Sequence, residues 1–172
     1  MNKFSCESFI MIKNIKIISI LVLLFFTASC ATQKQAQKST GPISEIENDV
    51  YAGKDRIKFL ADGIPDRIFF ATNKSDITTR GSETLLKQVA YLKTNSSFNI
   101  VLEGHADERG TREFNLALGE KRANTVRDFL MVNGIASDRI KVLSYGKERP
   151  ANPASNPLAW SQNRRTVTVK VN

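Results

Sequence analysis

Residues 103–124 read EGHADERGTREFNLALGEKRAN, and they join the end of a predicted strand to a loop and a predicted helix. Apolar and polar residues alternate over 98–103, which predicts a strand with one face inward. Apolar residues then recur at helical spacing over 112–132, with Phe114 among those expected to face inward, and Gly134 follows where a helix would end. A strand, a loop and a long helix in this order indicate an α/β domain.

The alternation typical of strands and the spacing typical of helices also occur before and after residues 98–132. The other predicted strands cover 67–71, 140–145 and 167–171, the other predicted helix covers 79–93, and one helical turn covers 157–162. The order β-α-β-α-β-β predicts an α/β (α+β) fold, a two-layer sandwich with parallel strand pairs and the helices on one face of a small sheet. We assign residues 56–172 to this domain.

The composition excludes several classes of protein. With 41% hydrophobic residues, the 172-residue chain can bury a core, which excludes a wholly disordered chain. Two Cys and one His are too few for a Cys-rich zinc module or a disulfide-stapled miniprotein. We therefore expect a site made of carboxylates, guanidinium groups and amides, with no metal and no cofactor. The net charge of +8 is compatible with nucleic acid, another acidic polymer or an anionic envelope surface.

The N-terminal segment has the pattern of a targeting signal. Residues 17–28 form an apolar run, IISILVLLFFTA, after the basic residues Lys13 and Lys16. A spanning helix needs about 20 apolar residues, so this run is too short for a permanent membrane anchor. Basic residues, a short apolar run and a small-residue exit predict a signal peptide over 1–29. A true start at Met11 stays open as an alternative.

The exit of the predicted signal peptide points to lipidation. The sequence Thr27-Ala28-Ser29-Cys30 resembles the lipobox of bacterial lipoproteins, although Thr27 stands where Leu is usual. The resemblance implies cleavage before Cys30 and acylation of its thiol, and several acyl chains hold a protein on a bilayer durably. The polar segment 30–55 then forms a flexible tether. An ordinary signal peptide with an incidental cysteine is the alternative.

The loop and helix of residues 103–124 hold the candidate binding residues. Asp107 lies in the loop, and Asn115 and Arg122 are seven residues apart, so they point to the same side of the helix. Loops after the carboxyl ends of strands are where α/β sheets usually bind ligands. A carboxylate beside a guanidinium is complementary to a zwitterion. The alternative is a surface ion pair between Asp107 and Arg122, which contributes roughly 0 to 1 kcal/mol.

A family resemblance covers about residues 65–171. The sequence is similar to the OmpA-like peptidoglycan-binding domain family in the motifs Gly104-His105-Ala106-Asp107-Glu108-Arg109-Gly110-Thr111, Asn115, Leu118-Gly119, Arg122-Ala123, Ser144-Tyr145-Gly146 and Asn163-Arg164-Arg165. The resemblance implies non-covalent binding of the diaminopimelate in the peptidoglycan stem peptide.

The same resemblance assigns roles to individual residues. It implies that Asp107 and Arg122 hold the two charged groups of the ligand, and that Asn115 orders the loop. It also implies that backbone amides near Thr72 and Asn73 line the site. The chain departs from the family there, because Thr72-Asn73 stands where Phe-Asp is frequent, and Ala71 stands where the family often has Asp.

The resemblance further implies a place in the cell envelope. With Cys30 acylated and Ala31 in place of an inner-membrane retention Asp, we expect a lipid-anchored protein of the outer membrane whose domain faces the periplasm. Implied partners are peptidoglycan, the periplasmic propeller TolB and other Tol proteins, with a role in envelope integrity and cell division. No nucleic-acid partner is expected, because no aromatic residues are interleaved with Arg164-Arg165.

Two other classes of protein remain as alternatives. A motor or stator component with the same domain needs a spanning helix with an ionisable residue, which the short apolar run lacks. A cell-wall lytic enzyme needs a catalytic constellation. Asp107 and Glu108 are adjacent, so their side chains diverge and do not form a catalytic carboxylate pair. His105 has no Cys or second His beside it, so we expect it to have a structural role. We therefore expect no catalytic residues.

Overall fold

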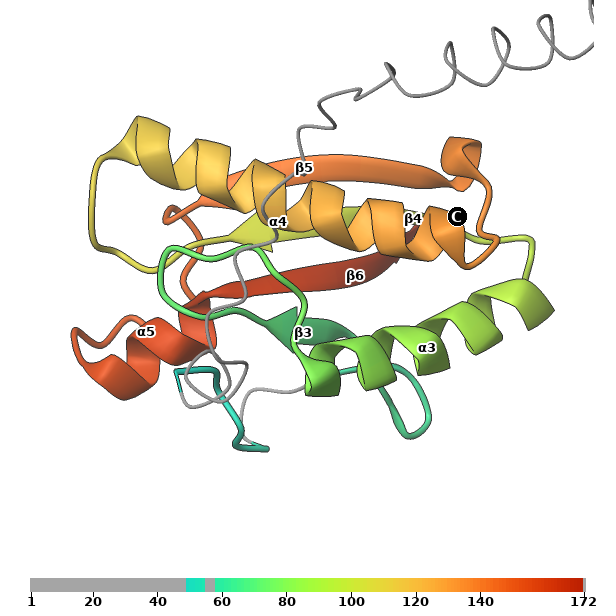
Figure 1. Ribbon diagram of the computed structural model, residues 1–172, viewed down its shortest axis with the longest axis horizontal. Helices are drawn as coiled ribbons and strands as arrows, with labels where there is room; N and C mark the ends of the chain where they lie inside the picture. The colour runs from blue at the N-terminus through green and yellow to red at the C-terminus, as the bar shows by residue number, and fades with distance from the viewer. Residues whose placement is uncertain (1–48, 55–57, 172) are drawn as a thin grey trace, which may run out of the picture. The chain divides into compact units, whose positions relative to one another are not determined.

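The computed structural model describes residues 49–54 and 58–171 (Figure 1). The strands are β1 (Phe59–Ala61), β2 (Ile64–Pro65), β3 (Arg67–Phe69), β4 (Asn99–His105), β5 (Ile140–Gly146) and β6 (Arg165–Val171). The helices are α3 (Thr79–Thr94), α4 (Arg112–Val132), α5 (Pro157–Asn163) and the short 3-10 helix η2 (Ser137–Arg139). The predicted strands and helices are all present in the predicted order. The hairpin β1–β2 was not predicted.

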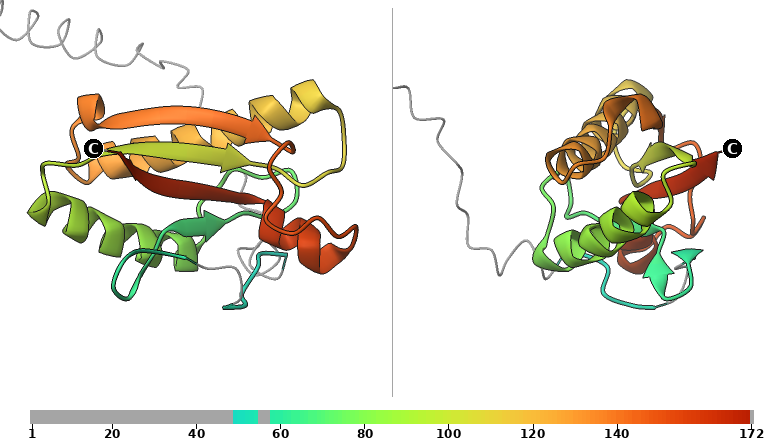
Figure 2. Two further views of the ribbon diagram at one scale, coloured as in Figure 1. Left: turned by 180° about the vertical axis from the view of Figure 1, so that it is seen from behind. Right: turned by 90° about the vertical axis from the view of Figure 1, so that its right-hand side faces the viewer.

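The main sheet has four strands in the order β3-β6-β4-β5. Strand β6 is antiparallel to both of its neighbours, β3 and β4, whereas β4 and β5 are parallel and are joined through α4. Helices α3 and α4 cover one face of the sheet (Figure 2). The predicted two-layer sandwich is confirmed, but only one of the three neighbouring strand pairs is parallel, because the C-terminal strand inserts between β3 and β4.

The core lies between this face of the sheet and the two helices. Every second residue of β4 points into it, which gives the alternation that predicted the strand. The buried core residues are Ile68, Phe70, Leu85, Val89, Leu92, Ile100, Leu102, Ala123, Val126, Leu130, Ile135 and Ile140.

Helix α4 packs closely against the end of β4. A methyl group added at Gly104 would lie 1.8 Å from the carbonyl oxygen of Gly119, so only two glycines allow this approach. Asn115 and Arg122 lie on the same face of the helix as Gly119, the face that packs against the sheet, and both are buried. Phe114 precedes Asn115 by one residue, so its side chain points about 100° away around the helix axis. Its side chain is 50% exposed, so its predicted inward orientation was wrong.

Threonine side chains define where the two long helices begin. The hydroxyl oxygen of Thr78 accepts a hydrogen bond from the amide of Gly81, and that of Thr111 accepts one from the amide of Phe114. Each cap satisfies an amide that has no partner inside its helix. Thr111 thereby ends the loop 106–110 and fixes where α4 starts.

The predicted signal peptide 1–29 and Cys30 lie outside the described residues. Of the predicted tether 30–55, only 49–54 is described, and Tyr51 is buried against the domain. The ring of Tyr51, within the predicted tether, contacts Phe69 of β3. Among the described residues, no helix is long and apolar enough to cross a membrane.

Candidate ligand-binding site

The loop between β4 and α4 places Asp107 at the C-terminal end of β4. The carboxylate is almost fully buried, and Arg109 holds it with Nε at 3.0 Å, Nη2 at 2.7 Å and the backbone amide at 3.1 Å. Nη1 of Arg164 lies 3.5 Å from the same carboxylate. Burial raises the pKa of Asp107, but the hydrogen bonds and positive charges of Arg109 and Arg164 outweigh it and lower the pKa. Asp107 is therefore a fixed negative charge.

Asn115 orders this loop from the first turns of α4. Its Nδ2 donates to the carbonyl oxygen of Arg109 at 2.8 Å, and its side chain is buried. Lys147 supports the loop from the other side, because its Nζ donates to the carbonyl oxygen of Gly110 at 2.8 Å. The loop-ordering contact that the resemblance implied for Asn115 is present in this geometry.

Arg122 is fully buried, and its partners are backbone carbonyls. It donates from Nε to Lys74 at 2.9 Å, from Nη1 to His105 at 2.9 Å and from Nη2 to Ala71 at 3.0 Å. Burial, together with the charge of Arg164, lowers the pKa of Arg122 to about 10. The alternative of a surface ion pair between Asp107 and Arg122 was wrong, because Arg122 is inside and Asp107 pairs with Arg109. Arg122 ties the segment after β3 to the end of β4.

Arg164 is the basic residue that reaches both sides of the site. Its side chain is 3% exposed and donates to the carbonyl oxygen of Phe70 at 2.9 Å from Nε. Nη2 lies 3.0 Å from the carboxylate of Asp49, and Nη1 faces Asp107. The sequence prediction gave Arg164 no ligand-binding role, but Arg164 is buried in the site, and Arg165 is buried as well. The motif Asn163-Arg164-Arg165 was the signal that pointed here.

Thr72 and Asn73 form the rim of the site after β3. The amide of Thr72 donates to Oδ2 of Asp49 at 2.5 Å, and its hydroxyl accepts a hydrogen bond from Nη2 of Arg109 at 3.3 Å. Asn73 is exposed and has a φ of 55°, a left-handed conformation that Asn tolerates better than most residues. Thr72 is therefore in contact with the site, while Asn73 shapes the turn beside it.

The sequence prediction also missed the outer wall of the site. The guanidinium carbon of Arg109 lies 4.3 Å from the centre of the Trp160 ring, a cation–π contact. Trp160 Nε1 donates to Glu108 at 2.8 Å, and the hydroxyl of Ser155 donates to the same carboxylate. This wall comes from α5 and the segment before it, far from the loop in sequence, so no local pattern indicated it.

Together these groups make a polar site with both signs of charge on buried supports. Asp107 and Arg164 are the buried ions, and Arg109 and Asp49 are their half-exposed partners. Such a site can hold a ligand that carries an ammonium and a carboxylate close together. Within the described residues, no group of three or more His, Cys, Asp and Glu side chains could hold a metal ion.

Comparison with known protein families matches residues 69–164 to the OmpA family. The matched segment is more than half of the chain and includes Asp107, Asn115, Arg122 and Arg164. The chain belongs to the OmpA family. The OmpA-like domain expected from the motifs after Gly104 is thereby confirmed.

Relatives of this OmpA family member include proteins named peptidoglycan-associated lipoprotein. The one from Mesorhizobium japonicum is 54% identical over 62% of this chain and 63% of the relative. The one from Brucella melitensis is 40% identical over 87% of this chain and 90% of the relative. The crystal structure of the one from Burkholderia pseudomallei is 34% identical, with a TM-score of 0.60 over 62% of this chain and 90% of that structure. The chain thus spans a little less than two thirds of the Mesorhizobium protein and most of the other two.

Proposed function

We propose that this chain is an outer-membrane lipoprotein that anchors the outer membrane to the cell wall. Its domain binds the diaminopimelate-containing stem peptide of peptidoglycan non-covalently. The observation that carries the proposal is the buried carboxylate of Asp107 beside Arg164, on a loop that matches the OmpA family. The names of relatives that align over 87% of the chain support the same function.

The charges of the site suit the free end of the diaminopimelate side chain. That end carries an ammonium and a carboxylate on one carbon centre. The ammonium replaces the Arg109 guanidinium on Asp107, and the carboxylate lies toward Arg164 and the amide of Thr72. A hydrogen bond to a charged group contributes roughly 1.5 to 3 kcal/mol, so two such contacts are enough for specific binding of a small ligand.

Arg122 has a second role in this proposal. Three of the five N–H groups of its guanidinium donate to backbone carbonyls, so in this proposal the buried cation holds the rim and the loop together and attracts the ligand's carboxylate by its charge, without direct contact. Asn115 keeps the loop in place, and Thr72 and Asn73 supply the rim. Binding is the whole activity proposed here, without hydrolysis of the wall.

The other end of the chain supplies the membrane attachment in this proposal. Acylation of Cys30 places the protein on the periplasmic face of the outer membrane, and the polar segment after it spans the gap to the domain. TolB and other Tol proteins are the proposed protein partners, and envelope integrity and cell division are the proposed processes. A chain fixed at both ends in this way transmits force between the membrane and the wall.

Sedimentation with purified diaminopimelate-type peptidoglycan tests the binding. We expect the mature chain to sediment with the wall and to release no soluble muropeptides. Asp107→Asn removes the charge that holds the ammonium, so we expect it to stay in the supernatant. Asp62→Asn is the matched control, because Asp62 is an exposed carboxylate in the β1–β2 turn, away from the site.

Arg122→Ala is a second variant, and its thermal unfolding must be measured alongside because Arg122 is buried. A wild-type chain that stays in solution, or a folded Asp107→Asn variant that binds like wild type, contradicts the proposal. Release of muropeptides by the wild type favours the lytic-enzyme alternative instead.

A further inference from the structure

The candidate site is filled by the chain's own charged groups. We call residues 49–54 the strap, because they run from the end of the predicted tether onto β3. The carboxylate of Asp49, at the start of the strap, accepts a hydrogen bond from the Thr72 amide and lies 3.0 Å from Nη2 of Arg164. The carbonyl oxygen of Asp49 accepts a second hydrogen bond from the same Nη2, at 2.5 Å. Asp49 thus occupies the position proposed for the ligand's carboxylate.

Arg109 fills the other half of the site. Its guanidinium binds both oxygens of Asp107, which is the position proposed for the ligand's ammonium. One side chain, Arg164, touches both halves through neighbouring nitrogens: Nη2 faces Asp49 and Nη1 faces Asp107. The two positions are therefore close enough to be taken by two charged groups on one carbon centre.

The two side chains proposed to receive the ligand's charges are much more buried than the two side chains that now occupy the ligand's positions. The receptor side chains, Asp107 and Arg164, are 9% and 3% exposed, whereas the occupants, Arg109 and Asp49, are 43% and 45% exposed. Buried side chains are held by their surroundings, but a half-exposed side chain can turn into solvent at little cost. Asp49 and Arg109 can leave the site while Asp107 and Arg164 stay in place.

We propose that the strap competes with the wall ligand for the site, with Asp49 as an internal stand-in for the ligand's carboxylate and Arg109 as a stand-in for its ammonium. This proposal rests on the function proposed above. Binding of the stem peptide expels the Asp49 carboxylate from Thr72 and Arg164. The last residues before the domain then detach from the site when the domain binds the wall.

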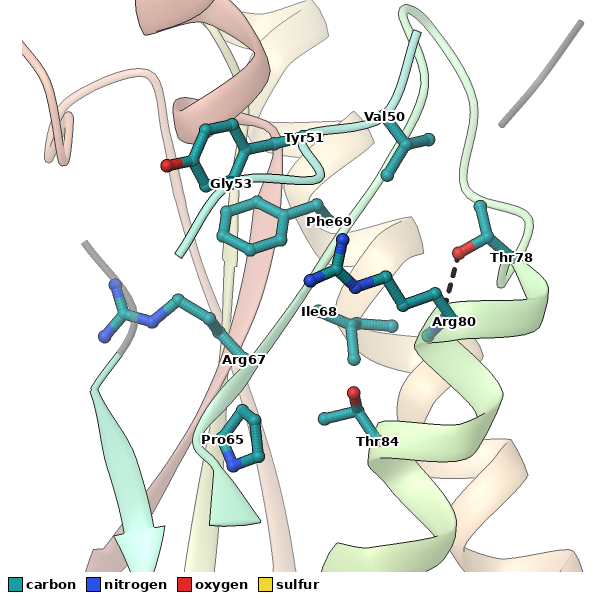
Figure 3. A pocket seen from close by; sticks show the side chains of 11 residues that line it. Val50, Tyr51, Gly53, Pro65, Arg67, Ile68, Phe69, Thr78, Arg80 and Thr84 are labelled. Atoms are coloured by element: carbon teal, nitrogen blue, oxygen red, sulfur yellow. Dashed lines mark hydrogen bonds between the residues drawn. The ribbon is translucent and has the colours of Figure 1, made fainter. Parts of the chain in front are cut away.

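The remainder of the strap has its own attachment to the domain. The ring of Tyr51 packs edge-on against Phe69 with the ring centres 4.9 Å apart (Figure 3). Arg80 donates to the carbonyl oxygen of Ala52 at 2.7 Å. These contacts lie on β3 and α3, away from Asp107. Loss of the Asp49 contacts therefore releases the start of the strap without requiring Tyr51 to leave its place.

Competition of this kind lowers the apparent affinity by the fraction of molecules in which the site is closed. We expect Asp49→Asn, which removes the charge that faces Arg164, to bind about three- to tenfold more tightly than wild type. The assay uses the mature chain and a soluble muramyl tetrapeptide that contains diaminopimelate. The fluorescence of Trp160, the single tryptophan of the chain, reports the departure of Arg109 from its ring.

Asp62→Asn is again the control, since it removes an exposed carboxylate of the same charge, and we expect its affinity to be unchanged. Equal or weaker binding by Asp49→Asn overturns the competition. Absence of binding by wild type and both variants overturns the proposed function itself, so the two failures are distinguishable.

A second measurement follows Asp49 directly. Burial raises its pKa, but the hydrogen bonds from Thr72 and the charge of Arg164 lower it below its ordinary value. We expect NMR titration of the Asp49 carboxyl carbon to give this lowered pKa in the free chain. In the chain saturated with the tetrapeptide we expect a value closer to the ordinary one. A pKa that does not change on saturation shows that Asp49 remains in the site and overturns the proposal.

Discussion

Acid should destabilise this domain through a single buried histidine, His105. Its ring is 2% exposed and stacks on Tyr145, with the ring centres 5.5 Å apart. No hydrogen-bond partner of either ring nitrogen is found among the described residues. Burial, together with the charges of Arg165, Arg67 and Arg149, lowers the pKa of His105 to about 3, against a smaller opposing effect of the Arg149 backbone.

The direction of the pH effect follows from the sign of that shift. The folded pKa of His105 is below its unfolded value of about 6.5, so the unfolded chain takes up the proton first as the pH falls. The contribution to stability is complete above pH 6.5 and is lost as the pH falls toward 3. With one proton involved, the loss is about 1.4 kcal/mol per pH unit below 6.5, or about 2 kcal/mol between pH 7.5 and pH 5.

Urea unfolding at pH 7.5 and pH 5 measures this loss. The chain has one His, so no other imidazole contributes. The pKa values of Asp49 and Asp107 lie below the ordinary aspartate value, so their effects on stability begin at lower pH. His105→Leu keeps a side chain of similar size, and we expect its unfolding free energy to be nearly the same at both values of pH. A wild-type free energy that does not change, or a variant that loses as much as wild type, refutes the reasoning.

Three further substitutions test contacts that hold the domain together. Gly104→Ala places a methyl group against the carbonyl of Gly119, and we expect it to cost about 3 kcal/mol of unfolding free energy in a urea titration, because backbone must move. Arg139→Ala removes hydrogen bonds to the carbonyls of Leu92, Asn95 and Phe98, so we expect a lower thermal midpoint and a loss of about 2 kcal/mol. Asn115→Ala frees the carbonyl of Arg109, and we expect about 1 kcal/mol of lost stability together with faster hydrogen exchange in the loop 106–110. In each case, wild-type behaviour contradicts the contact assigned to that residue.

The sequence predicts the long elements well because their periodicity reflects burial on one side. The alternation in β4 and the apolar spacing in α3 are direct consequences of the single core between sheet and helices. The hairpin β1–β2 has strands of three and two residues, too short to show a period. Its signal was Asp62-Gly63, since Gly63 has a φ of 67° in the turn.

The candidate site is predictable only where its residues lie on one local segment. Asp107 and Asn115 are on the loop and helix that a single motif describes, and the structure places them together. Arg164 reaches Asp107 because β6 inserts beside β4, a pairing that the order of elements along the chain does not reveal. Asp107 was expected beside Arg122, but it pairs with Arg109 instead. This difference also depends on tertiary packing, because packing buries Arg122 completely.

The three carbonyls bound by Arg122 come from segments that are far apart in the sequence. Ala71 and Lys74 follow β3, His105 ends β4, and Arg122 itself lies midway along α4. The rim at Thr72 and the loop at Asp107 therefore reach their places only after the sheet and α4 have assembled around one guanidinium. Folding of the domain and formation of the site are a single event. If the proposed function holds, a chain that is still unfolded therefore has no site with which to bind the wall.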